Sequence, residues 1–276
     1  MKSNVPGANW ALLLIQMLVI SLNASSGSLP SGKSNKYIDK TIPEAESFLT
    51  ETDFQNSRNE QLLLTGRQKR QLDLLMVGEP NNREEENGDD SAMYSKDRFE
   101  GDIVTLVNPK INESEMAHPQ LGVGTVMRNA VKQAYLKWPN GRIPYSISSQ
   151  YTSFGRARIA AALQEYQEKT CIKFEPKTDA DLDYVHVVPE EGCYSMVGKT
   201  GGKQPVSIGN GCIQKGIIIH ELMHSVGFFH EQSRADRDSY ISIVWSNVET
   251  GLEDQFDKYS LAIIDHLGTK YDYGSP

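Results

Sequence analysis

Three of the six histidines in this 276-residue chain stand close together, at positions 220, 224 and 230. In a helix, residues four apart lie on one face, so His220 and His224 would present two imidazoles to the same point. Gly227 can end that helix, because glycine tolerates positive φ, and the chain can then turn back to bring in His230. Imidazole nitrogens that converge in this way are typical zinc ligands. The spacing therefore predicts one zinc ion (Zn2+) per chain, held by His220, His224 and His230.

Glu221 follows the first of these histidines directly. It is rotated by about 100° round the helix, so it cannot bind the metal beside His220 but can reach a water on it. Three neutral ligands leave the zinc its charge and an open position, where the pKa of a bound water falls to about 7. Glu221 can then act as general base and pass the proton to a leaving amine. We expect a zinc metalloendopeptidase that acts on protein or peptide substrates. The remaining histidines, which show no such pattern, are expected to be ordinary core or surface residues: His118, His186 and His266.

The elements that must position these residues follow residue 128. Alternating and β-branched residues predict strands at 143–148, 171–176, 184–189 and 204–209. Residues 156–170 have helical composition and one apolar stripe, formed by Ile159, Ala160, Leu163 and Tyr166. Residues 215–229 are apolar nearly all round, which predicts a second, buried helix. Two helices among several strands, without a βαβ pattern, favour an α+β fold.

The N-terminus is typical of a secretory signal. Trp10–Leu22 is an apolar run, and the small residues of NASSGS follow it. A membrane anchor is the alternative, but the run is short for a span. We therefore expect a secreted, extracellular protein with no membrane partner once the signal is removed. Asn112 begins an Asn-Glu-Ser sequence, which predicts a glycosylation site in a secreted chain.

The amino-acid composition and the charged clusters indicate which classes of binding partner to expect. The net charge is −8 and no long run of Lys and Arg stands out, so we expect no nucleic-acid partner. The short basic cluster RQKR (67–70) is either an exposed charge patch or a processing site for a trypsin-like or dibasic-cleaving protease, and the sequence leaves both open. Three cysteines are an odd number, so one thiol has no partner within the chain.

HELMHSVGFFHEQSRADRD (220–238) closely resembles the signature of the astacin family, beyond the general metzincin pattern. The segments RIPYSIS, TCIKF and GCYSMVGKTGGKQPVSIGNGC also look like astacin segments, in the expected order. The resemblance covers about residues 129–275. It implies a metzincin, zincin-like N-terminal catalytic subdomain with a mixed sheet and two long helices, preceded by a largely irregular propeptide. It also implies a secreted zinc endopeptidase made as a zymogen.

One upstream piece extends the resemblance. RFEGDI (98–103) is similar to the family's propeptide motif, in which an aspartate sits on the zinc, and this implies that Asp102 is a latch. The family also implies activation by a trypsin-like protease after Arg128, so that Asn129 becomes the N-terminus and its ammonium pairs with Glu231. An ordinary exposed surface charge is the alternative for Glu231. The expected domains are a signal peptide at 1–25, a propeptide at 26–128 and a peptidase domain at 129–276.

The cysteines and the last residues point to a departure from the family. The resemblance pairs Cys193 with Cys212, and Cys171 with a C-terminal cysteine that is absent here, so Cys171 is expected to be unpaired. YDYGSP (271–276) resembles the lead-in to the family's Met-turn, so we expect a precursor truncated before that turn, without its C-terminal subdomain. The alternative function is therefore a catalytically inactive, zinc-binding product that acts as a binding or decoy module.

Overall fold

The computed structural model describes residues 36–59, 95–96, 98–104, 129–265 and 267–274. All of them belong to one unit, Asn35–Pro276. The strands are β1 (Glu46–Ser47), β2 (Ile103–Val104), β3 (Ala130–Val131), β4 (Arg142–Ser148), β5 (Lys173–Pro176), β6 (Tyr184–Val188), β7 (Cys193–Met196), β8 (Lys203–Ile208) and β9 (Ile264–Asp265). The α-helices are α3 (Ser153–Lys169) and α4 (Lys215–Val226), and residues 51–59 are also helical. Short 3-10 helices are η2 (Ala134–Leu136), η3 (Pro139–Gly141), η4 (Glu231–Ser233), η5 (Arg237–Ser239), η6 (Trp245–Asn247) and η7 (Glu253–Phe256).

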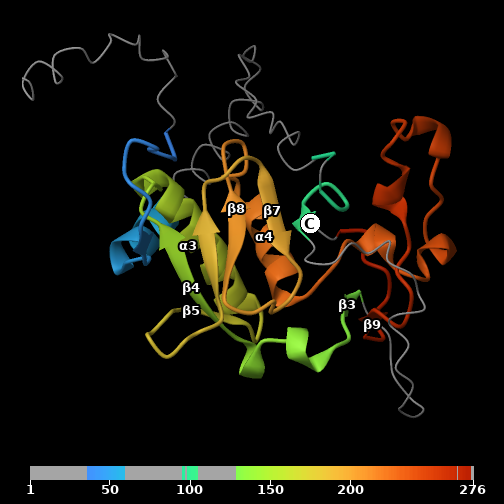
Figure 1. Cartoon of the computed structure of the whole chain (residues 1–276), viewed down its shortest axis with the longest axis horizontal. Coiled ribbons are helices and arrows are strands. Elements are labelled where there is room, and N and C mark those ends of the chain that lie inside the picture. Colours follow the sequence, from blue (N-terminus) through green and yellow to red (C-terminus); the bar gives the residue numbers. More distant parts are fainter. Residues whose placement is uncertain (1–35, 60–94, 97, 105–128, 266, 275–276) are drawn as a thin grey trace, which may run out of the picture. The chain divides into compact units, whose positions relative to one another are not determined.

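Seven of the strands form one sheet in the order β1-β4-β6-β8-β7-β2, with β5 paired to β4 as well (Figure 1). Strands β4, β5, β6 and β8 run parallel to one another, and β2 runs parallel to β7. The β7–β8 and β1–β4 pairs are antiparallel. The predicted mixed sheet is therefore confirmed. Strands β3 and β9 form a separate antiparallel pair, and Ala130 of β3 also forms a bridge with Phe228.

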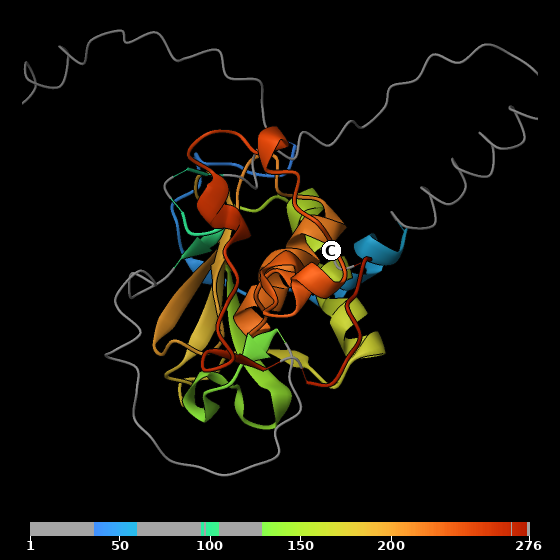
Figure 2. The ribbon, with the colours of Figure 1, turned by 90° about the vertical axis from the view of Figure 1, so that its right-hand side faces the viewer.

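Two helices cover the sheet, and Figure 2 shows both on the same side of it. α3 packs against α4, and α4 packs against β7 and β8. The apolar stripe predicted on α3 is buried, and α4 adds its own apolar residues to the same core: Ile159, Ala160, Leu163, Tyr166, Ile217, Ile218 and Leu222. This shared core fixes α4, and with it the first two histidines, against the sheet. The predicted α+β fold is confirmed.

Several boundaries differ from the sequence-based prediction. α4 ends at Val226 rather than at 229, because Gly227 adopts φ +123° and caps the helix. α3 begins at Ser153 rather than at 156, because the hydroxyl of Thr152 accepts a hydrogen bond from the backbone N–H of Gly155. Strand β7 was not predicted, because its short, mixed-polarity sequence has no clear alternation.

The region predicted to be an irregular propeptide contains a stretch of regular structure that the sequence did not reveal. Residues 36–59 contribute strand β1 and a helix at 51–59. Ile38 and Leu49 are buried in the same core as the sheet and helices. This stretch is polar in composition, so its few apolar anchors gave no periodic signal.

Cys193, the first residue of β7, forms a disulfide with Cys212 in the loop before α4. The pairing implied by the family resemblance is therefore present. Cys171 is exposed and carries a free thiol. Across the described residues, no helix has the length and apolarity needed to cross a membrane.

Candidate metal centre

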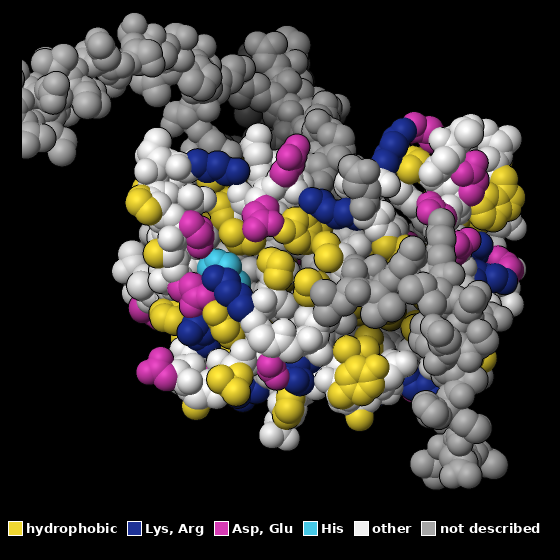
Figure 3. Space-filling model, in the orientation of Figure 1, with side chains coloured by type: hydrophobic (Ala, Val, Ile, Leu, Met, Phe, Trp, Pro, Cys, Tyr) yellow, Lys and Arg dark blue, Asp and Glu magenta, His cyan; other side chains and the backbone are white. Residues whose placement is uncertain are grey.

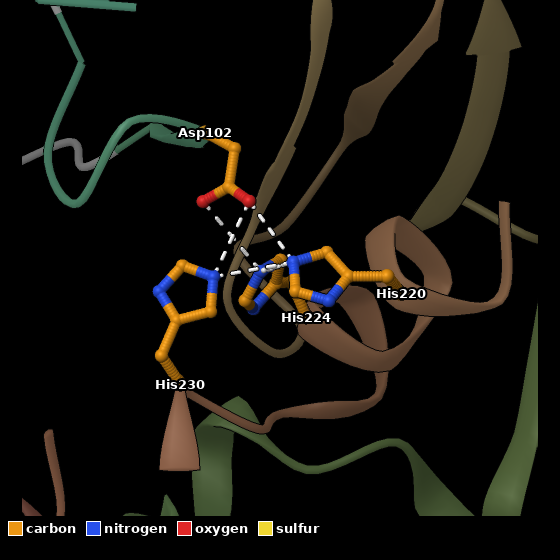
Figure 4. A group of neighbouring side chains, drawn as sticks. All are labelled: Asp102, His220, His224 and His230. Carbon is orange, nitrogen blue, oxygen red and sulfur yellow. Dashed lines mark hydrogen bonds and ion pairs between the residues drawn. The ribbon is translucent and has the colours of Figure 1, made fainter. Parts of the chain in front are cut away.

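The imidazoles of the three clustered histidines converge on one point. Nε2 of His220 lies 3.1 Å from Nε2 of His224 and 3.2 Å from Nε2 of His230. Figure 4 shows the three rings facing a common space, with the carboxylate of Asp102 directly above it. One ligand atom from each of these four residues lies within 4.8 Å of the others. The structure therefore brings together the three predicted ligands and the predicted latch, in a nearly fully buried site.

The turn after α4 delivers the third histidine. The N–H of Gly227 donates to the carbonyls of Met223 and His224, which closes the helix. A side chain at Gly227 is excluded, since a Cβ there would lie 2.8 Å from Cγ2 of Val131. The chain then runs beside β3, where the N–H of Phe229 donates to the carbonyl of residue 129, and reaches His230. The glycine role predicted from spacing is thus the one observed.

The chemistry of the donor set fits a metal ion. Nδ1 of His224 donates to the carbonyl of Phe228 at 2.7 Å, so its Nε2 carries a lone pair that points into the cluster. Tetrahedral zinc with Zn–N of 2.0–2.1 Å separates its nitrogen ligands by about 3.3–3.4 Å, close to the observed spacing. Oδ1 of Asp102 is buried and accepts no hydrogen bond from any described residue. A cation at the centre satisfies the lone pairs and this oxygen together.

Electrostatics at the site favour the same conclusion. Burial raises the pKa of Asp102, but the hydrogen bonds from His220 and His230 and the electrostatic influence of His224 outweigh it and hold that pKa well below its usual range. Burial lowers the pKa of His230, but hydrogen bonds to Asp102 and Glu100 outweigh it and raise that pKa to about 10. The pocket thus stabilises positive charge at His230, whereas burial lowers the pKa of His224 and favours its neutral form, which is the form that binds a metal.

Asp102 is held in place by the backbone on both sides of it. β2 pairs with β7, and the carbonyl of Asp102 accepts from the N–H of Ser195 at 3.0 Å. The guanidinium of Arg98 donates to the carbonyls of Glu191 and Cys193 and lies 4.1 Å from the ring centre of Tyr194. Oδ2 of Asp102 consequently lies 2.9 Å from Nε2 of His220.

Sequence reasoning missed Glu100, which lies two residues before the latch. Its buried carboxylate accepts from Nδ1 of His230 at 2.7 Å and from the hydroxyl of Ser233. Glu100 has φ +50°, a left-handed conformation that is uncommon outside glycine. A carboxylate on the far nitrogen of a ligating histidine orients the ring and raises its basicity. The available signal was its place inside FEGD, between Phe99 and Gly101.

Comparison with known proteins adds a decisive observation. The model of the astacin peptidase family matches residues 130–276. The chain belongs to the astacin family. It is 56% identical over 243 residues to zinc metalloproteinase nas-13 of Caenorhabditis elegans, and the match covers 87% of this chain and 50% of that protein. It is 48% identical over 256 residues to zinc metalloproteinase nas-15 of the same organism, covering 90% and 41%.

Among solved structures, the astacin chain is similar to high choriolytic enzyme 1, a hatching enzyme zinc-protease from the medaka fish Oryzias latipes. The identity is 42% and the TM-score is 0.48, over 52% of this chain and 74% of that one. The chain spans about half the length of the two nematode relatives described above. Astacins are zinc enzymes, and this member has a cluster of three histidines and one aspartate able to hold that ion.

Glu221 lies on α4, between the predicted ligands His220 and His224. It is fully buried on α4, and neither carboxylate oxygen has a hydrogen-bond partner among the described residues. Burial and the nearby charge of Asp102 raise the pKa of Glu221 well above its ordinary value. An unpartnered buried carboxyl group of this kind is costly to the stability of the fold.

Asn129 lies beside the stretch of chain that leads to Glu231, its expected partner. The side-chain amide of Asn129 donates to the carbonyls of Phe229 and His230. The carboxylate of Glu231 accepts from Arg234 at 2.9 Å and from the backbone N–H of Asp272 at 2.9 Å. Glu231 is therefore a paired, partly buried group in this astacin, rather than a freely exposed surface charge.

A cavity of about 430 Å³ adjoins the metal cluster. Its lining comprises the three histidines, Met223, Phe228, Phe229, Glu231 and residues 269–272. It is large enough for one or two amino-acid side chains, which suits a peptide ligand.

The remaining predicted features lie outside the described residues: Arg128, Asn112, His118, His266, the signal segment and the RQKR cluster. His186 is buried and hydrogen-bonds to Ser146 and Glu44, in agreement with a structural role.

Proposed function

We propose that the chain is the precursor of a secreted zinc endopeptidase, made as a zymogen, and that His220, His224 and His230 hold the zinc. The single observation that carries the proposal is the convergence of three imidazole nitrogens within 3.1–3.2 Å, beside an unpartnered buried carboxyl group. These three histidines would hold a zinc ion, which when bound would supply a water of pKa about 7 and polarisation of a peptide carbonyl.

Glu221 performs the proton transfers in this proposal. It lies one residue after His220 on α4, and no described residue occupies its oxygens. It accepts the proton of the attacking water and donates it to the amine nitrogen of the leaving peptide. The burial that raises its pKa brings it towards the range in which a carboxyl group can both accept and donate near neutral pH.

Asp102 keeps the precursor silent. Its carboxylate closes the fourth side of the cluster, where substrate and water would otherwise enter. We propose that a trypsin-like protease cuts after Arg128, that the segment carrying Asp102 then leaves, and that the new ammonium of Asn129 pairs with Glu231. The domains are a signal peptide at 1–25, a propeptide at 26–128 and a peptidase domain at 129–276. The disulfide between Cys193 and Cys212 suits a secreted protein.

Limited trypsin treatment of the secreted full chain tests the function. The treated protein should cleave an unstructured protein substrate, and a zinc chelator should abolish the cleavage. The Glu221→Gln variant should bind zinc as before but turn over about 10²–10⁴-fold more slowly. N-terminal sequencing should identify Asn129 as the first residue. Zinc binding without any turnover would instead support the binding-module alternative and reject the endopeptidase.

A further inference from the structure

One described part of the expected propeptide lies far in sequence from the metal latch. Residues 36–59, here called the N-terminal segment, add strand β1 to β4, with Glu46 opposite Ser148 and Ser47 opposite Ile147. The pairing continues beyond β1, where the N–H of Asp39 donates to the carbonyl of residue 150 at 2.8 Å. This part of the β4 edge is the part that β5 leaves uncovered, since β5 pairs only with Arg142–Tyr145.

Apolar contacts reinforce the strand. Ile38 and Leu49 are only 5% and 8% exposed and lie in the main hydrophobic core, in one cluster with Tyr145 and Tyr151. Two further side chains of the segment, Tyr37 and Phe54, pack partly against the same core. Burial of large apolar side chains is the main source of binding free energy between protein surfaces. The segment is therefore packed as part of the domain rather than laid on its surface.

The charges of the N-terminal segment and of the domain surface that it contacts are complementary. Glu46 contacts Lys203 at 2.9 Å and Lys177 at 3.4 Å, and the hydroxyl of Tyr184 donates to it at 2.7 Å. Figure 3 shows acidic and basic side chains close together over the sheet on this face. An acidic segment on a basic edge gives specificity as well as attraction.

A second ion pair between the segment and the domain is more deeply buried. The carboxylate of Asp53 accepts from the guanidinium of Arg156 on α3 at 3.0–3.2 Å, and both side chains are largely buried. The same carboxylate caps the segment's own helix by accepting from the N–H and hydroxyl of Thr50. Arg156 also donates to the hydroxyl of Ser47. Removing one partner of such a pair leaves a buried charge without compensation.

Gly155 on α3 shows that the domain is shaped for this segment. A Cβ at Gly155 would lie 2.5 Å from the carbonyl oxygen of Tyr37. Glycine inside a helix is less favourable than alanine by about 0.5–1 kcal/mol. The close approach of the segment's backbone is the structural reason for a glycine at this position. Cδ1 of Tyr151, a residue of the domain itself, is the next neighbour at 3.2 Å, so the tightest contact at this position is the one with the segment.

The N-terminal segment and the latch occupy opposite edges of the sheet. β1 lies at one end of the strand order and β2, which carries the latch, lies at the other. Residues 60–94, which join them, lie outside the described residues and contain the RQKR cluster at 67–70. Because the two attachments use different strands of the sheet, one can be lost without the other.

We propose that the N-terminal segment stays bound to the domain by these contacts when the chain is cut within residues 67–70, so that the cut protein is a non-covalent complex and the segment remains even after the part that carries Asp102 has left. The segment's binding surface is the β4 edge, Gly155 and Arg156, and it is separate from the metal site. The proposal does not depend on peptidase activity, and its test uses an engineered cut.

The test replaces Arg67–Arg70 in the full chain by the recognition sequence of a site-specific protease. After cleavage, gel filtration at micromolar concentration and mass spectrometry follow the N-terminal fragment. We expect it to elute with the rest of the protein. In the Gly155→Ala variant it should elute separately while the domain stays folded, because alanine strengthens the helix but blocks Tyr37. Gly216→Ala is the matched control, since a Cβ there meets nothing within 4 Å.

A second pair of variants places the change in the fragment, where domain folding is unaffected. Asp53→Ala should weaken rebinding of the fragment roughly a hundredfold. Glu51→Ala should leave it nearly unchanged, because Glu51 pairs, among the described residues, with exposed Arg58 of the segment itself. Separation of the wild-type fragment after cleavage would overturn the proposal. Equal retention of the wild-type, Gly155→Ala and Asp53→Ala proteins would also overturn it.

Discussion

The carboxylate of Glu100 lies 2.7 Å from Nδ1 of His230, although 130 positions separate the two residues. Asp102, two residues further along, lies 3.3 Å from Nε2 of the same ring. One short turn of the upstream chain therefore contacts His230 at both nitrogens. We therefore propose that the latch is a pair of carboxylates: Asp102 closes the metal position, and Glu100 fixes the orientation of the His230 ring.

Glu100→Ala should weaken zinc retention in the uncut precursor. The substitution removes the carboxylate that accepts hydrogen bonds from Nδ1 of His230 and from the hydroxyl of Ser233. Loss of the hydrogen-bond acceptor of a metal-binding histidine typically lowers metal affinity about 10–100-fold. Zinc release to a chromophoric chelator measures the effect. Glu51→Ala is the control. After activation the two proteins should release zinc at equal rates, and a difference that persists there would contradict the assignment.

Asp102→Ala should produce a precursor that is active without proteolysis. The small side chain leaves the fourth side of the cluster open to water and substrate while the three histidines remain. Hydrolysis of a fluorogenic peptide by the uncut chain provides the readout, with exposed Asp179 replaced by alanine as the control. A precursor that carries zinc and stays silent would show that the latch is not what blocks the site.

Gly227→Ala should destabilise the domain by roughly 2–4 kcal/mol, since it combines a left-handed backbone with a steric overlap against Val131. Urea unfolding gives the free energy of unfolding. The double variant with Val131→Ala should lose less than the sum of the two single changes, because the overlap is removed. Strict additivity would mean that Val131 does not restrict this turn.

The histidine cluster shows how much the sequence could predict. Helix periodicity fixed the shared face of His220 and His224, and glycine chemistry predicted the turn that brings in His230. Elements set by distant pairing could not be predicted in the same way. Strand β7 is extended because it pairs with β8 and β2, and β1 is extended because it pairs with β4. Glu100 was missed for a similar reason, since its role depends on a contact across 130 positions.

Acid should loosen the N-terminal segment. Burial raises the pKa of Glu46, but Tyr184, Lys203 and Lys177 outweigh it and lower that pKa to about 2. A depressed pKa contributes stability above the ordinary value near 4.5, and that contribution is lost as the pH falls towards 2. The buried pair of Asp53 with Arg156 acts in the same direction, because it lowers the pKa of Asp53.

Retention of the cut fragment should therefore fall between about pH 5 and pH 3. Glu46→Gln should bind more weakly at neutral pH and show a shallower pH dependence. A wild-type fragment that is retained equally at both pH values, with the domain folded, would show that these carboxylates do not anchor the segment.

The most direct test of the zinc site is X-ray absorption at the zinc edge on the purified full chain, together with its metal content. The account predicts one zinc per chain, bound by three imidazole nitrogens and one carboxylate oxygen. In the Asp102→Ala protein the three imidazoles should remain and the carboxylate signal should disappear. A folded protein with no tightly bound zinc, or one whose zinc is bound by the sulfur of Cys171, would contradict it.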